Sequence, residues 1–206
     1  KEQELYQFLT HIMIFFLYGE DSYRRNKKLK ELVAAYKGKY ENADLFKADL
    51  DEDPGLWEKA RDFLSQSSMF ADSKLLVVSE SGAVKEKERK EWQKILKSEL
   101  KSPRVFVIIS DRGKPKKDFD FLLKEPVKRQ FFTPLRGGGL SQFLTGEAEA
   151  KELKFENHAW NFFIDYLSAG DEATSRGMNE LEKIALANFK APITLHDIQQ
   201  LIYSAE

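Results

Sequence analysis

The chain of 206 residues is 42% apolar and 13% aromatic, enough for one large or two modest hydrophobic cores. Its 33 Lys and Arg against 34 Asp and Glu give a formal charge of -1, which excludes the strong overall basicity of an autonomous nucleic-acid-binding protein and still allows a local basic face. The lack of cysteine excludes disulfides, thiolate metal sites and cysteine nucleophiles, and favours a reducing, cytoplasmic location.

Short β-rich runs alternate with helical patterns over the first two thirds of the chain. We predict strands at 12–18, 43–49, 74–79, 104–110 and 127–133, and helices between them at 21–37, 54–66, 85–100 and 116–124. Some of these strands are continuously apolar, as in a sheet with both faces covered. The alternation therefore predicts an α/β fold with a parallel five-stranded sheet of the P-loop-like, nucleotide-binding type. The most apolar run, 12–18, is far shorter than the roughly 20 residues that span a bilayer, so no membrane span is expected.

The first strand is followed by a turn where such folds place a phosphate-binding loop. Gly19 suits the turn, but no second glycine and no Lys-Ser/Thr pair follows. Glu20 and Asp21 occupy the helix start, where carboxylates would repel a nucleotide. We therefore predict no tight ATP binding and no cofactor. The next helix begins with a basic cluster that could follow a phosphate backbone or form a solvated face: Arg24, Arg25, Lys27, Lys28 and Lys30.

The second predicted helix ends in a serine-rich run that is followed by an apolar pair. Its apolar stripe includes Trp57 and Phe63, and the acidic residues and Pro54 before it suit a helix start. Serines compete with helical hydrogen bonds, so Met69 and Phe70 are expected at the helix end or in the loop beyond it. A Phe in such a place is usually a core residue between helix and strand. The other interpretation is an apolar pair that contacts a partner.

The third strand ends in Ser79-Glu80, where a nucleotide hydrolase would carry a magnesium-binding Asp. Ser79 cannot replace that ligand, and Glu80 is interpreted as a solvated strand-end carboxylate. A second basic cluster follows the fourth strand, at Arg112, Lys114, Lys116 and Lys117. The sequence has no nucleophile elbow, zinc-protease motif or dinucleotide fingerprint.

The β signal disappears after the glycines at 137–139, where we predict a domain boundary or hinge. The rest of the chain reads as a small helical bundle. The predicted helices lie at about 140–152, 156–168, 172–188 and 195–203, the last with Thr194 as its N-cap.

Taken together, these features resemble the delta subunit family of bacterial DNA polymerase III clamp loaders. The resemblance is carried by the order and spacing of the segments 16–21, 57–78 and 177–184, and it covers nearly the whole chain from about residue 12. It implies a degenerate AAA+ domain at 12–136 that does not hydrolyse ATP, followed by a helical lid domain at 140–206. Members of the family continue into a third, collar domain, for which we expect no counterpart in this sequence. The sequence is thus expected to be either a fragment or an unusually short relative, and assembly with other loader subunits through a collar is not expected.

The resemblance also implies a partner and a contact site. In the family, an apolar pair at this helix end enters a pocket of the ring-shaped sliding clamp, the beta subunit. Met69 and Phe70 match the pair, flanked by Ser68 and Ala71, although the family's usual first residue is Leu. The implied function is a subunit of the polymerase holoenzyme that binds and opens the clamp during replication and has no catalytic residue of its own. The alternatives are a nucleotide-binding P-loop-like ATPase and a DNA-binding accessory module.

Overall fold

The computed structural model describes residues 14–66, 73–100, 102, 104–189 and 192–203. The chain divides into a first unit of Lys1–Glu20 with Arg24–Phe132 and a second unit of Asp21–Tyr23 with Thr133–Glu206. Each unit has its own hydrophobic core. None of the helices in the described ranges is long and apolar enough to cross a membrane.

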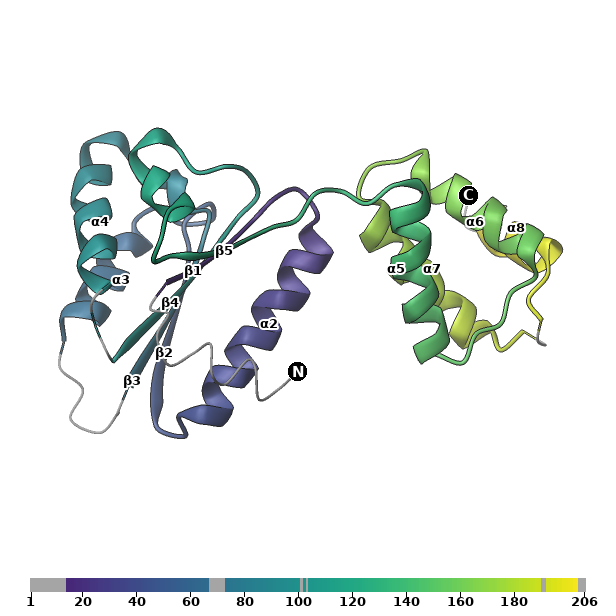
Figure 1. The fold of residues 1–206 in the computed structure, drawn as a ribbon, viewed down its shortest axis with the longest axis horizontal. Coiled ribbons are helices and arrows are strands. Elements are labelled where there is room, and N and C mark those ends of the chain that lie inside the picture. Colours follow the sequence, from purple (N-terminus) through teal and green to yellow (C-terminus); the bar gives the residue numbers. More distant parts are fainter. Residues whose placement is uncertain (1–13, 67–72, 101, 103, 190–191, 204–206) are drawn as a thin grey trace. The chain divides into compact units, whose positions relative to one another are not determined.

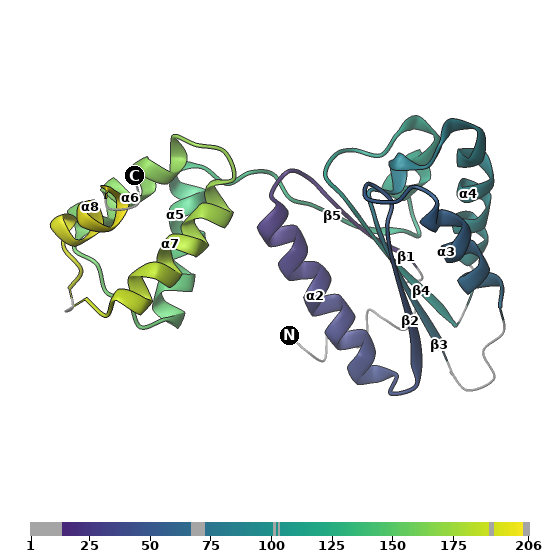
Figure 2. The same ribbon diagram turned by 180° about the vertical axis from the view of Figure 1, so that it is seen from behind.

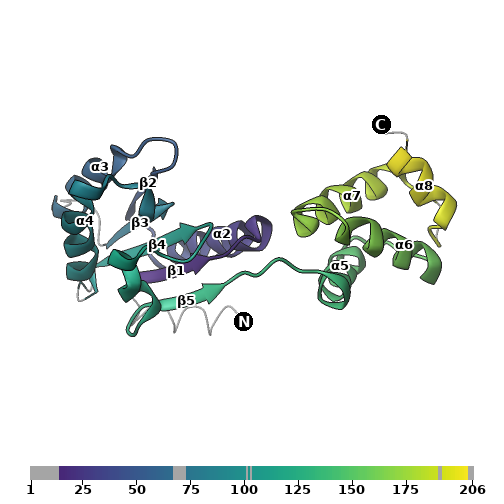
Figure 3. The same cartoon turned by 90° about the horizontal axis from the view of Figure 1, so that it is seen from above.

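The first unit is built on a five-stranded sheet in the order β2-β3-β4-β1-β5, and every neighbouring pair is parallel (Figure 3). The strands are β1 (Ile14–Tyr18), β2 (Ala43–Asp49), β3 (Ser73–Ser79), β4 (Val105–Asp111) and β5 (Lys128–Phe131). β3 and β4 lie inside the sheet and are buried over nearly their whole length, because helices cover both faces. The predicted parallel α/β fold is confirmed.

Helices cover the two faces of this sheet unequally (Figures 1 and 2). α2 (Ser22–Lys39) covers one face, and α3 (Leu56–Ser65), α4 (Glu86–Glu99) and the 3-10 helix η2 (Lys117–Leu123) cover the other. Alternate strand residues supply the two cores, so Leu75 packs on the α2 side and Leu76 on the α3 and α4 side. A short 3-10 turn, η1 (Ser81–Ala83), follows β3. The predicted helix at 116–124 is thus a 3-10 helix, interrupted by non-helical backbone at Phe119.

The second unit contains four helices in its described part, α5 (Gly137–Ala150), α6 (Asn157–Ser168), α7 (Ala173–Ala187) and α8 (Leu195–Tyr203). Their core includes Leu144, Leu167 and Leu181. Gly177 allows α7 to approach α5 closely, since a Cβ there would lie 2.6 Å from Leu144 Cδ1. Asp21 belongs to this unit, where its carboxylate accepts a hydrogen bond of 2.8 Å from Thr174 Oγ1.

Two predictions for the helical unit have different outcomes. Thr194 is confirmed as the N-cap of α8, because its hydroxyl accepts a hydrogen bond from the Asp197 N–H at 3.3 Å. Asp197 Oδ2 in turn accepts from the N–H and the hydroxyl of Thr194, and these bonds lower the pKa of the Asp197 carboxyl. By contrast, the glycines at 137–139, where we predicted a domain boundary or hinge, form the first turn of α5, and its buried Leu140 offsets their poor helix propensity. The two units divide a few residues earlier, between Phe132 and Thr133.

Candidate functional site

Two places in the first unit bear on function. The first is the carboxyl edge of the sheet, by which we mean the residues at the ends of β1, β3 and β4 in this unit, Gly19 and Glu20, Ser79 to Ser81, and Ser110 to Arg112. Ligands of open parallel sheets bind outside this edge. The second is the junction between α3 and β3, which carries the predicted clamp-binding residues.

Gly19 sets the backbone geometry of the carboxyl edge. Its φ is +127°, and a Cβ there would lie 2.2 Å from the carbonyl oxygen of Phe132. Only glycine combines this φ with this close approach. The Gly19 N–H donates to the Asp111 carbonyl at 3.1 Å, which ties the turn to the end of β4. The predicted turn glycine is confirmed, and its N–H is already used within the protein.

Arg25 fills the space next to this turn. Its guanidinium donates to the Gly19 carbonyl oxygen and to Ser110 Oγ, the latter at 3.1 Å, and the residue is only 8% exposed. A buried guanidinium requires acceptors, and the carbonyl oxygen of Gly19 and the hydroxyl oxygen of Ser110 supply them within the first unit. The sequence grouped Arg25 with a basic cluster that could follow a phosphate backbone or form a solvated face, whereas the Arg25 side chain is buried and bonded within the protein.

Asp111 is the second buried charged group of the carboxyl edge. Its carboxylate accepts hydrogen bonds from the Ser81 N–H at 2.8 Å and the Ser81 hydroxyl at 2.7 Å. Burial is the main cause that raises the pKa of Asp111 to about 6, and the bonds from Ser81 act in the opposite direction. Both carboxylate oxygens of Asp111 are therefore buried and bonded to Ser81.

Glu80 is also engaged within the protein. It follows β3 with a left-handed φ of 53°, and its Oε1 accepts a hydrogen bond of 2.7 Å from the Arg112 N–H. The predicted solvated carboxylate is therefore half-buried and bonded. In the described ranges, no cluster of three His, Asp or Glu side chains could hold a metal ion. The carboxylates of Glu80 and Asp111 at the carboxyl edge are thus hydrogen-bonded to other residues of the same edge.

The α3–β3 junction is held together by Lys74, the second residue of β3. Its ammonium donates hydrogen bonds to the carbonyl oxygens of Phe63 and Gln66 and lies 5.1 Å from the centre of the Phe63 ring. A cation is favourable at this position because the carbonyl groups of a helix C-terminus carry partial negative charge. α3 ends at Ser65, whose hydroxyl donates to the Asp62 carbonyl at 3.0 Å. Both flanks of the intervening segment are therefore fixed.

The predicted clamp-binding residues Ser68, Met69, Phe70 and Ala71 lie outside the described residues. They belong to residues 67–72, which we call the docking segment. It starts after Gln66 and ends before the buried Ser73. The buried face of α3, the helix before this segment, was predicted correctly. Trp57 and Ala60 are buried, and Phe63 and Leu64 pack against the same core.

The other predicted basic residues lie on α2 and in the loop after β4. Arg24 lies 5.7 Å from the centre of the Phe132 ring, Lys28 pairs with Glu31 at 3.1 Å, and Lys27 is exposed. In the loop, Lys116 donates to the Gly82 carbonyl at 2.6 Å. The structure thus gives several of these cations partners within the protein.

Two residues of the site were not singled out from the sequence. Lys74 was assigned only to a strand, although a lysine at the start of an otherwise apolar strand is a signal, since a buried cation requires acceptors. Asp111 ends an apolar strand in the same way. Neither position reveals which partner it has, because Gln66 and Ser81 come from other elements.

Comparisons with known proteins bear on the fold of the chain. No protein-family model matches the chain. A protein of Helicobacter pylori (strain J99) is 27% identical over 209 residues, covering 92% of this chain and 58% of that protein. The Bacillus subtilis DNA clamp loader delta protein (YqeN) has a similar structure, with a TM-score of 0.54 and 18% identity over 98% of this chain and 61% of that one.

Domain III of the Thermotoga maritima replication initiation protein DnaA is similar too, with a TM-score of 0.58 and 11% identity over 98% of this chain and 88% of that one. At such identities the likeness concerns the fold alone. This chain spans less than two thirds of the length of the H. pylori and B. subtilis proteins. It shares with its structural neighbours a parallel α/β fold followed by an all-helical region, as predicted from the sequence.

Proposed function

We propose that this chain acts as a clamp-loader delta-type subunit that binds a sliding clamp through Met69 and Phe70 and opens it during DNA replication. In this role it hydrolyses no ATP itself and serves within a polymerase holoenzyme. The contact site is the docking segment.

The observation that carries the proposal is the fixed α3–β3 junction. Lys74 bonds to carbonyls on the α3 side, and Ser73 begins the buried strand on the other side. An apolar pair in a short segment between two fixed ends loses less conformational entropy on binding than one in a free loop. Large apolar side chains that enter a partner's pocket are the usual energetic centre of a protein interface.

The carboxyl edge supports the non-catalytic part of the proposal. Arg25, Ser81 and Asp111 use their polar groups on one another and on the strand ends. No Lys-Ser/Thr pair follows Gly19, so the phosphate contacts and the magnesium ligand of a P-loop enzyme have no counterpart in the sequence. Saturable ATP binding at micromolar concentration, in the presence of magnesium, would contradict this part and favour a nucleotide-binding ATPase.

The likeness to the clamp loader delta protein of B. subtilis supports the same proposal at the level of fold. That protein is a DNA clamp loader delta protein, and we extend this role to the present chain as a hypothesis. Association with other loader subunits belongs to the same hypothesis.

The decisive experiment measures binding to the sliding clamp of the same organism. Phe70→Ala should weaken binding by roughly 2 kcal/mol or more, about thirtyfold, because it removes the larger apolar group of the pair. Met69→Leu should preserve binding, since the two side chains have similar volume. The matched control is Phe131→Ala, which removes a 50% exposed Phe from β5 of the same unit and should leave binding unchanged. Equal affinity of Phe70→Ala and the wild type would overturn the assignment.

A further inference from the structure

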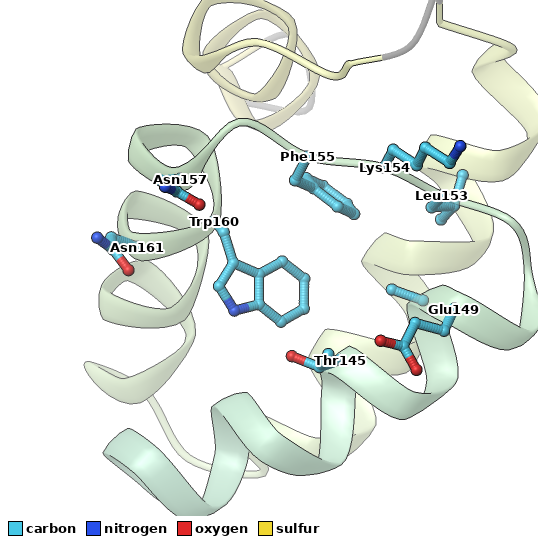
Figure 4. A pocket seen from close by; sticks show the side chains of 9 residues that line it. Thr145, Glu149, Leu153, Lys154, Phe155, Asn157, Trp160 and Asn161 are labelled. Carbon is cyan, nitrogen blue, oxygen red and sulfur yellow. The ribbon is translucent and has the colours of Figure 1, made fainter.

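The helical unit contains a cavity that the proposed function does not use. It has a volume of about 610 Å³ and lies between α5, α6 and the connection that joins them (Figure 4). Cavities that bind small molecules are typically about 300–1,000 Å³ in volume. The size is therefore sufficient for a ligand as large as a nucleotide.

Two aromatic rings form the apolar part of the cavity. Figure 4 shows the indole of Trp160 in its middle with Phe155 beside it. The rings meet edge to face, with centres 5.0 Å apart, and the indole N–H donates to Ser141 Oγ at 3.0 Å. The ring of Trp160 is thus fixed in place, its one polar group is satisfied, and it remains half-buried at the cavity. A planar ligand can stack on such a surface without rearranging it.

Polar side chains line the cavity on both sides of these rings. Asn157 and Asn161 are one turn apart on α6, and Thr145 and Glu149 are one turn apart on α5 (Figure 4). All four are exposed, and within the described part of the chain their side chains make no hydrogen bond or ion pair. Lys151, close by on the same connection, is by contrast paired with Glu182. The cavity therefore offers unused donors and acceptors next to a fixed aromatic ring.

The combination restricts the chemistry of a ligand. A carboxamide offers a donor and an acceptor, and a hydroxyl can do either, so the ligand should present both kinds of group along one edge. Glu149 and Lys154 bring opposite charges, which leaves the lining without the net charge that a polyanion or a metal ion needs. A wholly apolar ligand would leave the polar groups unpaired.

We propose that this cavity binds a nucleobase, either from a free nucleotide or from single-stranded DNA. The base stacks on Trp160, and its hydrogen-bonding edge meets the carboxamides of Asn157 and Asn161. Carboxamides pair with base edges in known complexes, and stacking on an aromatic side chain accepts every base. Lys154 also lines the cavity and is the cation that would meet a phosphate of the ligand. The proposal does not depend on binding to a clamp.

The test uses tryptophan fluorescence of the full chain. The other two tryptophans, Trp57 and Trp92, are 2% and 0% exposed and lie in the first unit, so a ligand at the cavity should change the signal of Trp160 alone. The probes are AMP, CMP, GMP and dTMP, and a single-stranded DNA of about ten nucleotides, a length within the range that single-strand-binding folds cover. Saturable quenching that disappears in Trp160→Phe is the expected result. Quenching by the mononucleotides identifies a free nucleotide as a source, and quenching by the DNA alone identifies a single strand.

A pair of matched variants tests the polar part of the cavity. Asn161→Ala should weaken binding about tenfold, as expected for one lost base contact. Asn179→Ala removes an exposed asparagine from α7, away from the cavity, and should have no effect. The proposal would be overturned if no nucleotide quenched the fluorescence of Trp160, or if Asn161→Ala and Asn179→Ala weakened binding equally. An arginine-containing peptide serves as a probe for a protein ligand instead. Quenching by this peptide, with no quenching by any nucleotide, would also overturn the proposal.

Discussion

The carboxyl edge of the sheet and the α3–β3 junction lie at opposite ends of the same strands and use their charged residues in opposite ways. At the carboxyl edge, Arg25 and Asp111 bond to neighbouring groups and fill the place where parallel sheets bind ligands. At the junction, Lys74 holds the two flanks of a segment that carries an apolar pair. The two ends of β3 therefore differ in what their buried charges hold: strand ends and a turn at the carboxyl edge, and the C-terminus of α3 at the junction.

The largest expected effect of a substitution is at the carboxyl edge. Gly19→Ala should lower the free energy of unfolding by about 3 kcal/mol or more, because alanine disfavours the positive φ and its Cβ would clash with the Phe132 carbonyl. Denaturant unfolding measures the loss. Gly113→Ala is a suitable control, since a Cβ there meets nothing within 4 Å. Similar stability of the two variants would contradict the rigid carboxyl edge described here.

We expect the free energy of unfolding to depend on pH through the carboxyl group of Asp111. Its pKa is about 6 in the folded protein against an ordinary 3.8, so between these values the folded state binds more protons than the unfolded chain. The contribution of Asp111 to the free energy of unfolding therefore falls as pH rises from about 4 to about 6, by at most about 3 kcal/mol. Asp111→Asn cannot titrate and should not show this fall, while its carboxamide can still bond to Ser81.

The measurement is a pair of denaturant titrations at several pH values. The difference in unfolding free energy between Asp111→Asn and the wild type should shift in favour of the variant as pH rises through this range. A difference that stays constant from pH 4 to pH 7 would mean that the carboxylate is not desolvated in the folded protein.

The sequence predicted the fold well where periodicity and burial agree. The spacing of Trp57 and Ala60 set the phase of α3, and the apolar runs identified the buried strands. It did not distinguish the 3-10 helix η2 from an α-helix, because its buried Phe119 and Leu122 are three residues apart and fit both. The glycines before Leu140 predicted a hinge from propensity alone, and packing of that leucine overrides the propensity.

The candidate site was predictable only in part, for a physical reason. Charge clusters in a sequence look alike whether they are solvated or paired, so Arg25 was grouped with its exposed neighbours until its acceptors on Gly19 and Ser110 were known. The lack of a phosphate-binding motif after Gly19 could be recognised from the sequence, because such a motif consists of residues that are adjacent in the chain. Contacts such as that between Lys74 and Gln66 join different elements and require the fold.

The smallest expected effect on stability is at the α3–β3 junction, where the substituted residue is Lys74. Lys74→Met keeps the length and most of the apolar contact with Phe63, but it removes the bonds to the Phe63 and Gln66 carbonyls. We expect a loss of about 1–2 kcal/mol in the free energy of unfolding, since those carbonyls can regain hydrogen bonds from water. Lys59→Met, at an exposed position of α3, should change stability little.

The same variant separates a structural role of Lys74 from a role in presenting the docking segment. If the fixed flanks reduce the entropy lost on binding, Lys74→Met should also weaken clamp binding by about fivefold, the equivalent of about 1 kcal/mol of added conformational entropy. Lys59→Met should bind as the wild type does. A stability loss with unchanged clamp affinity would mean that Lys74 only supports the core. In that case the docking segment needs no fixed ends, and the apolar pair alone would account for binding.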